Sequence, residues 1–189
     1  MKLIKITGNE AEIDVDGRTH FVPFVVTGAN VQFAFDGEIY TVELPGPGRL
    51  STMAKPRLKD LPTLRAAGVD ILVCALTDED FADAGLADEP TAAVAAGLEF
   101  VHLPIPDWTV PAPERILPTL RELATRLDGG ASIVTHCWAG IGRSSLLAAS
   151  IMVLRGLAPD DAWARITKAR GHQVPDTEQQ REWVRTLSA

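Results

Sequence analysis

Residues Ala131–Leu154 read ASIVTHCWAGIGRSSLLAASIMVL, and this stretch decides the fold. It begins with a mainly apolar run of strand length, passes through a glycine-rich loop, and ends in an apolar run of helical length. An apolar strand without alternation is typical of a parallel sheet that is buried on both faces. The order of strand, short loop and helix therefore predicts an α/β protein in which the loop follows the carboxyl end of a strand.

The same alternation extends on either side of this stretch. Apolar runs at 69–76, 98–105 and 131–136 are predicted as strands, and segments 61–67, 89–96, 113–127, 144–155, 159–169 and 176–187 as helices. Strands that alternate with helices favour right-handed crossovers and parallel pairing. The predicted fold is therefore α/β, with a central, mostly parallel sheet of four or five strands and helices on both faces.

The first 44 residues follow a different pattern. Short runs of alternating apolar and polar residues are separated by turn signals such as Asp16-Gly17 and Asp36-Gly37, as expected for strands and hairpins. This predicts a small antiparallel β-meander over 1–44. The turn-rich connector Pro45–Leu50 then leads into a second domain, predicted over 45–189.

Composition limits the possible partners and the compartment. The 189 residues carry a net charge of −7, which argues against general binding to nucleic acid or to an anionic membrane. No segment reaches the roughly 18 apolar residues of a membrane span, and the first residues have no long apolar run, so no signal peptide is expected. Two cysteines are too few for a disulfide scaffold, so free thiols and a cytoplasmic location are expected. The oligomeric state stays open.

The loop after the strand 131–136 carries the candidate chemistry. Backbone N–H groups at a helix N-terminus favour anions, and the Arg143 guanidinium can hold two oxygens of a phosphate. Such surroundings also favour the thiolate form of cysteine, which makes Cys137 a candidate nucleophile. Ser144 can hydrogen-bond the sulfur, and His136 is expected to orient the loop.

Six residues of this loop match a known signature: His136, Cys137, Gly140, Gly142, Arg143 and Ser144. The pattern resembles that of the cysteine-dependent protein tyrosine phosphatase superfamily. The similarity extends from Pro45 to the end of the chain, and Pro47–Arg57 also resembles the opening of the compact dual-specificity-like branch. The resemblance implies hydrolysis of a phosphomonoester through a cysteinyl phosphate, with no metal and no cofactor.

The resemblance also assigns further residues. Family members carry a general-acid aspartate in a loop about 30 residues before the cysteine, and Asp107 in LPIPDWTVPAP occupies that place. In some members a glutamine near the C-terminus positions the hydrolytic water. Gln173, Gln179 and Gln180 are the candidates, and Gln179 is preferred.

The loop residues that would surround the phosphate are His136, Trp138, Ala139, Gly140, Ile141 and Gly142. Three of them, Trp138, Ala139 and Ile141, are uncharged, which disfavours substrates with several phosphates. Some family members also have a second cysteine that forms a reversible disulfide with the nucleophile. Cys74 is either such a partner for Cys137 or a buried apolar residue.

Three functions fit the sequence. The first is a phosphatase of phosphoproteins that acts on phosphotyrosine, and possibly on phosphoserine and phosphothreonine. The second is a phosphate-binding pseudophosphatase that serves as an interaction module. The third is a phosphatase of a small phosphorylated molecule.

Overall fold

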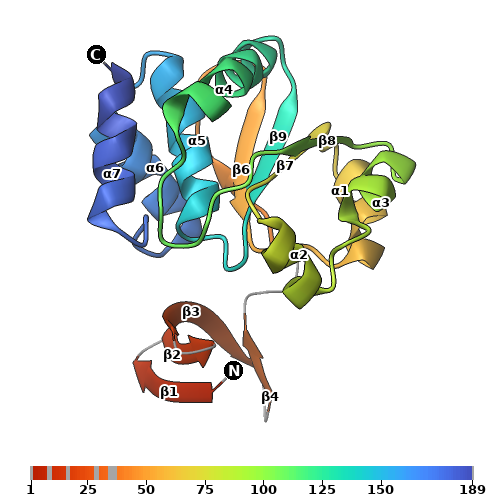
Figure 1. Cartoon of the computed structure of the whole chain (residues 1–189), viewed down its shortest axis with the longest axis vertical. Coiled ribbons are helices and arrows are strands. Elements are labelled where there is room, and N and C mark those ends of the chain that lie inside the picture. The colour runs from red at the N-terminus through yellow and green to blue at the C-terminus, as the bar shows by residue number, and fades with distance from the viewer. Residues whose placement is uncertain (1, 8–9, 16–17, 28–29, 34–37, 189) are drawn as a thin grey trace.

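The computed structural model describes residues 2–7, 10–15, 18–27, 30–33 and 38–188 (Figure 1). Its first four strands form one antiparallel sheet in sequence order: β1 (Lys2–Thr7), β2 (Glu10–Val15), β3 (Arg18–Thr27) and β4 (Asn30–Phe33). Each strand pairs with the next along the chain, which confirms the predicted β-meander.

The second sheet has five strands in the order β5-β6-β9-β7-β8. They are β5 (Tyr40–Val42), β6 (Arg49–Met53), β7 (Ile71–Cys74), β8 (Glu99–His102) and β9 (Ser132–His136). Only the β5–β6 pair is antiparallel, whereas β6, β9, β7 and β8 run parallel. This confirms the mostly parallel sheet and places β9, the strand that leads into the glycine-rich loop, at its centre.

The predicted division at Pro45 needs a correction, because β5 belongs to the second sheet. Tyr40–Val42 pairs with β6, and the Thr41 and Ser51 hydroxyls lie 3.0 Å apart across the pair. The two sheets therefore divide between Phe33 and Tyr40. Alternation in the sequence identifies a strand but not its pairing partner, which is why this strand was assigned to the wrong sheet.

Helices cover both faces of the second sheet (Figure 1). They are α1 (Leu61–Ala66), α2 (Asp78–Ala84), α3 (Glu89–Ala95), α4 (Pro113–Asp128), α5 (Arg143–Leu154), α6 (Pro159–Arg170) and α7 (Glu178–Arg185), with short 3₁₀ turns at Leu58–Asp60 and Thr186–Ser188. Helices α4 to α7 lie on one side and α1 and α3 on the other. Among the described helices, none is both long and apolar enough to cross a membrane.

Successive residues of the central strands pack into different cores. Ile71 and Val73 of β7 join the core under α4 to α7, whereas Leu72 joins the core under α1 and α3. On β9, Ile133 and Val134 divide in the same way. Both faces of these strands are buried, which explains why their sequences are apolar without alternation.

Helix α5 is buried nearly all round, from Arg143 to Val153. It packs against α4, α6 and α7, so the apolar run after the loop is a central helix of the domain. Strand β6 and helix α2 were not predicted. Helix α2 has only seven residues and begins with a capping box between Thr77 and Asp80, a short signal within the acidic run TDED.

Candidate active site

The loop from Cys137 to Gly142 connects the carboxyl end of β9 to the N-terminus of α5. The Thr135 hydroxyl donates to the Ser144 carbonyl at 2.9 Å, which ties the strand to the first turn of the helix. Gly142 is the N-cap residue of α5, and its carbonyl accepts the Leu146 N–H at 2.8 Å. The loop therefore lies where the sequence predicts, at the carboxyl edge of a parallel sheet where ligands bind in such folds.

Cys137 lies at the base of this loop and is only 3% exposed. Its sulfur is the atom that faces Ser144. It is 3.5 Å from the Ser144 Oγ, which is fully buried on the first turn of α5. A serine hydroxyl at this distance can donate to a thiolate and stabilise it when it leaves a phosphoryl group. The structure thus brings together the thiol and the hydroxyl that the sequence proposes as partners.

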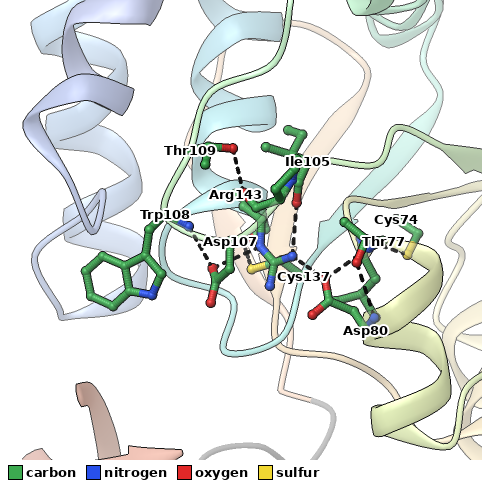
Figure 2. Close-up of polar contacts among 12 residues, drawn as sticks. Cys74, Thr77, Asp80, Ile105, Asp107, Trp108, Thr109, Cys137 and Arg143 are labelled. Atoms are coloured by element: carbon green, nitrogen blue, oxygen red, sulfur yellow. Dashed lines mark hydrogen bonds and ion pairs between the residues drawn. The ribbon is translucent and has the colours of Figure 1, made fainter. Parts of the chain in front are cut away.

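Arg143 is 1% exposed and is held by three groups, as Figure 2 shows. Its Nη1 lies 2.5 Å from Asp80 Oδ2 and 3.1 Å from the Ile105 carbonyl oxygen, and its Nε lies 3.2 Å from Asp107 Oδ1. Burial opposes its charge, but the neighbouring Cys137, Asp107 and Asp80 raise the pKa of Arg143 above its usual value. The guanidinium is therefore a fixed, permanently charged fork beside the Cys137 sulfur.

Asp80 is a site residue that the sequence analysis missed. It receives the Arg143 guanidinium, and its other contacts form the capping box of α2. Although burial opposes ionisation, the Thr77 backbone and Arg143 keep the pKa of Asp80 below its ordinary value. A capping pattern at Thr77 predicts only a helix start, so nothing local indicates that this carboxylate also orients an arginine 63 positions away.

Asp107 stands on the segment that follows β8. The Ile105 N–H donates to the Ala75 carbonyl, and a turn closed by the Thr109 hydroxyl and the Pro106 carbonyl then presents Asp107 to Arg143. Figure 2 shows the carboxylate pointing toward the guanidinium and the Trp108 indole directed away from it. Trp108 has a φ of 62°, an uncommon value for a bulky residue, and such strain is found where a loop positions functional groups.

The other loop residues differ in how open they are to a ligand. Ile141 is 4% exposed and belongs to the core under α4 to α7, so its side chain is structural. Ala139 is half-buried against the same core. Trp138 is half-buried against a small core cluster that contains Leu76 and Phe81. The Lys55 ammonium lies 5.1 Å from the centroid of the Trp138 ring. Lys55 thus places a positive charge beside an uncharged loop.

His136 does not face the loop opening. It is fully buried at the end of β9, and its Nε2 lies 3.1 Å from Oε1 of Glu89, which is also fully buried at the start of α3. His136 is therefore held by Glu89, and its contact with a substrate stays a prediction. Cys74 and Cys137 are both free and buried, and a disulfide between them stays a prediction.

Of the candidate glutamines, the structure brings Gln180 to the site. Gln179 is exposed on α7, whereas Gln180 is fully buried and its Nε2 donates to the Thr109 carbonyl at 3.3 Å. A Cβ added at Gly142 would lie 3.1 Å from this Nε2. The structure therefore places Gln180 beside the loop instead of the preferred Gln179, because a one-residue step on a helix moves a side chain about 100° around its axis. The role of either glutamine in positioning water stays a prediction.

Arg170 is a second buried cation near the site. Its guanidinium lies 4.3 Å from the Tyr40 ring centroid and donates to Thr52 Oγ1 at 3.3 Å. Burial lowers the pKa of Arg170, and Cys137 and Asp176 act against that shift. The sequence offers no local signal for this role, since Arg170 ends helix α6 like an ordinary C-terminal basic residue.

Asp176 lies beside the loop from Cys137 to Gly142. Its carboxyl accepts the Gly142 N–H, and a Cβ at Gly142 would lie 2.0 Å from its Oδ2. Asp176 as a whole residue is exposed to solvent, but its carboxyl is turned toward the protein and lies against Gly142. Burial of that carboxyl and the nearby Asp107 raise the pKa of Asp176 to about 6, against the attraction of Arg143 and Arg170.

Asp176→Asn is expected to remove part of the pH dependence of stability. Because the folded-state pKa of about 6 exceeds the ordinary 3.8, the folded protein holds a proton that the unfolded chain has released in this window. The contribution of Asp176 to the stability of the wild-type protein therefore falls as pH rises from about 4 to 6. In urea denaturation, the free energy of unfolding of the variant minus that of wild type should increase as pH rises from about 4 to 6. Above about pH 6 this difference should stay constant. A difference that does not change with pH would contradict this.

Gly140→Ala is expected to destabilise the domain through the loop. Gly140 has a φ of +74°, and an added Cβ would lie 2.5 Å from the Met53 carbonyl carbon. The left-handed conformation alone costs about 1–2 kcal/mol for a non-glycine residue, and the clash with backbone adds to this. The matched control is Gly85→Ala, where φ is +66° and no neighbour lies within 4 Å. Equal losses in urea denaturation would show that the approach to Met53 contributes nothing.

The geometry and the fold together define a class of protein. A cysteine at the base of a glycine-rich loop, an arginine fork on the following helix and an aspartate on the facing segment form the site of a phosphatase of the dual-specificity and tyrosine phosphatase type. The chain belongs to the family described as "PTP-SAK: Swiss Army Knife protein, DSP-PTPase phosphatase domain", which matches residues 41–189. This match begins within β5, in agreement with the corrected boundary.

Two curated relatives share part of the sequence. The chain is 30% identical over 90 residues to cyclin-dependent kinase inhibitor 3 of Rattus norvegicus, which covers 47% of this chain and 42% of the relative. It is 33% identical over 84 residues to a tyrosine-protein phosphatase of Autographa californica nuclear polyhedrosis virus, which covers 42% of this chain and 49% of the relative. The chain thus spans less than half the length of each.

Solved structures share the fold over most of the chain. Kinase associated phosphatase with serine at its catalytic cysteine aligns with a TM-score of 0.71 at 21% identity, covering 80% of this chain and 96% of that one. Tk-PTP in its active form gives 0.63 at 27% identity, covering 79% and 96%. PTPMT1 in complex with PI(5)P gives 0.64 at 19% identity, covering 74% and 89%.

Proposed function

We propose that this protein hydrolyses phosphomonoesters through a cysteinyl phosphate on Cys137, and that its substrates are phosphotyrosine residues of proteins. The observation that carries the proposal is the convergence of three groups from distant parts of the chain. The Cys137 sulfur, the Arg143 fork and the Asp107 carboxylate meet at the carboxyl end of the central strand. Each supplies one function that phosphoryl transfer needs: a nucleophile, a charge clamp and a proton donor.

The contacts of Arg143 indicate how the phosphate is held. Asp80 and the Ile105 carbonyl engage Nη1, so the Nε and Nη2 edge can receive two phosphate oxygens. Asp107 already stands on that edge, 3.2 Å from Nε. A phosphate bound there would have the Cys137 sulfur beneath it and the Asp107 carboxyl beside its ester oxygen.

The reaction then has two steps. The Cys137 thiolate attacks phosphorus, the ester bond breaks, and Asp107 gives its proton to the leaving oxygen. Water next attacks the cysteinyl phosphate, Asp107 takes a proton from that water, and the sulfur leaves as a thiolate that Ser144 can stabilise. Inorganic phosphate is released and both residues return to their starting states.

The substrate class rests on the loop and on the relatives. The loop side chains Trp138, Ala139 and Ile141 carry no charge. In the part of the chain that the structure describes, the Lys55 ammonium lies over the Trp138 ring. Such surroundings suit a single phosphate on an aromatic ring. A viral relative is named as a tyrosine-protein phosphatase, which supports the same choice. We also propose a cytoplasmic location, because both cysteines are free thiols.

A panel of phosphorylated substrates tests the proposal. Phosphotyrosine, phosphoserine and phosphothreonine peptides of one sequence, together with small phosphorylated metabolites, are compared by kcat/KM with EDTA present. We expect phosphotyrosine peptides to be hydrolysed fastest. Faster hydrolysis of a metabolite would mean that the protein is a small-molecule phosphatase. Absence of turnover on every substrate would favour a pseudophosphatase that only binds phosphate.

A further inference from the structure

A second cluster of reactive side chains lies beneath the phosphate-binding loop. Cys74 is the last residue of β7, His136 is the last residue of β9, and Glu89 is the first residue of α3. Cys74 and His136 are register partners on neighbouring parallel strands, so their side chains emerge at the same edge of the sheet. One ligand atom from each of the three residues lies within 4.8 Å of the other two, and all three are fully buried.

The cluster is poorly satisfied by hydrogen bonds. Both carboxylate oxygens of Glu89 and both ring nitrogens of His136 lack a hydrogen bond of good geometry among the described residues. Glu89 Oε1 and His136 Nε2 nevertheless lie 3.1 Å apart, and the Cys74 thiol interacts with the Glu89 carboxyl. Buried polar groups nearly always have partners, and an unpartnered one calls for an explanation, of which a bound ion is one. The phosphatase reaction uses neither Glu89 nor Cys74, so its chemistry does not account for them.

The three donors form a typical zinc ligand set. Thiolate, imidazole and carboxylate groups bind Zn²⁺ at about 2.0–2.3 Å, which places tetrahedral ligand atoms about 3.3–3.8 Å apart. The cluster approaches this spacing before any ion is bound. We propose that Cys74, Glu89 and His136 bind a Zn²⁺ ion that joins β7, β9 and α3 beneath the phosphate-binding loop.

Binding has a defined proton balance. Burial and the nearby Glu89 raise the pKa of the Cys74 thiol, so the thiol keeps its proton while the site is empty. Zinc takes the sulfur as a thiolate, and one proton passes to solvent. The bound ion compensates the negative charge of the buried Glu89 carboxylate. It also holds the end of β9, from which the loop begins. This inference does not rest on the proposed phosphatase activity.

Co²⁺ is the probe, because a thiolate–Co²⁺ bond gives a charge-transfer band in the near ultraviolet and tetrahedral Co²⁺ absorbs strongly in the visible. The full chain carrying Cys137→Ser is used, so that the catalytic thiol cannot bind the metal. It is unfolded and refolded with Co²⁺, since the site is closed to solvent in the folded protein. We expect both signals at one equivalent, displacement by Zn²⁺, and a rise in Tm with bound metal.

Variants assign the ligands. Adding Cys74→Ser should abolish the charge-transfer band, and Glu89→Gln should weaken metal affinity at least about 10-fold. Asp88→Asn is the matched control, because it removes the neighbouring exposed carboxylate and should change nothing. Circular dichroism checks that each variant folds. If Cys74→Ser does not fold, Glu89→Gln, which preserves the shape of the side chain, is the variant that tests the ligand set. A Cys137→Ser protein with no charge-transfer band, or a band that persists without Cys74, would overturn the proposal.

Discussion

Cys137→Ser is expected to lower turnover of an aryl phosphate on the order of 10³-fold or more while the protein still binds oxyanions. Serine preserves the size of the side chain, but its hydroxyl is a far weaker nucleophile than a thiolate at neutral pH. The Arg143 fork and the backbone of the loop are unchanged, so the phosphate receptor remains. Initial rates with EDTA present measure the loss, and a tungstate-dependent rise in Tm measures the binding.

The oxyanion measurement also serves as the folding control for this variant. A protein that neither turns over substrate nor binds tungstate has lost its structure and does not test the nucleophile. If Cys137→Ser keeps more than a tenth of the wild-type rate, Cys137 is not the nucleophile and the two-step reaction is wrong.

Asp107→Ala is expected to have the second largest effect, and its size should depend on the leaving group. General acid catalysis contributes about 10²–10⁴-fold, most where the leaving oxygen is strongly basic. We therefore expect a loss in this range with a phosphotyrosine peptide and a smaller loss with an activated aryl phosphate.

The matched control for this variant is Glu114→Ala, which removes an exposed carboxylate at the start of α4, shortly after the Asp107 segment. It should retain the wild-type rate with both substrates. An Asp107→Ala enzyme with undiminished activity on the peptide would remove Asp107 as the acid, and Asp176, whose carboxyl lies beside the loop, would then be tested in its place.

The sequence predicts the centre of the site well because that part is local. Cys137, Arg143 and Ser144 lie within eight consecutive residues, so one strand–loop–helix unit positions all three. Asp107 was found because family resemblance gives its distance from the cysteine along the chain. In the sheet, apolar strands buried on both faces made β7 and β9 predictable.

The rest of the site depends on contacts between residues far apart in the sequence. Asp80 reaches Arg143 only because α2 packs at the end of β7, and Glu89 meets His136 only because α3 begins beside β9. In the sequence each is one acidic residue among many at a helix start. Gln180 and Gln179 were indistinguishable until the rotation of α7 placed one of them inside. Propensity and periodicity carry no information on such pairings.

The short strand β5 gives the catalytic centre a mechanical link to the chain that precedes it. Its Tyr40 lies against Arg170, and Arg170 in turn interacts electrostatically with Cys137 and Asp176. Tyr40 is thus connected to Cys137 by one ring contact with Arg170 and by the electrostatic interaction of Arg170 with the thiol. A force applied before Tyr40 would act first on an edge strand of three residues and, through it, on the charge surrounding the thiol.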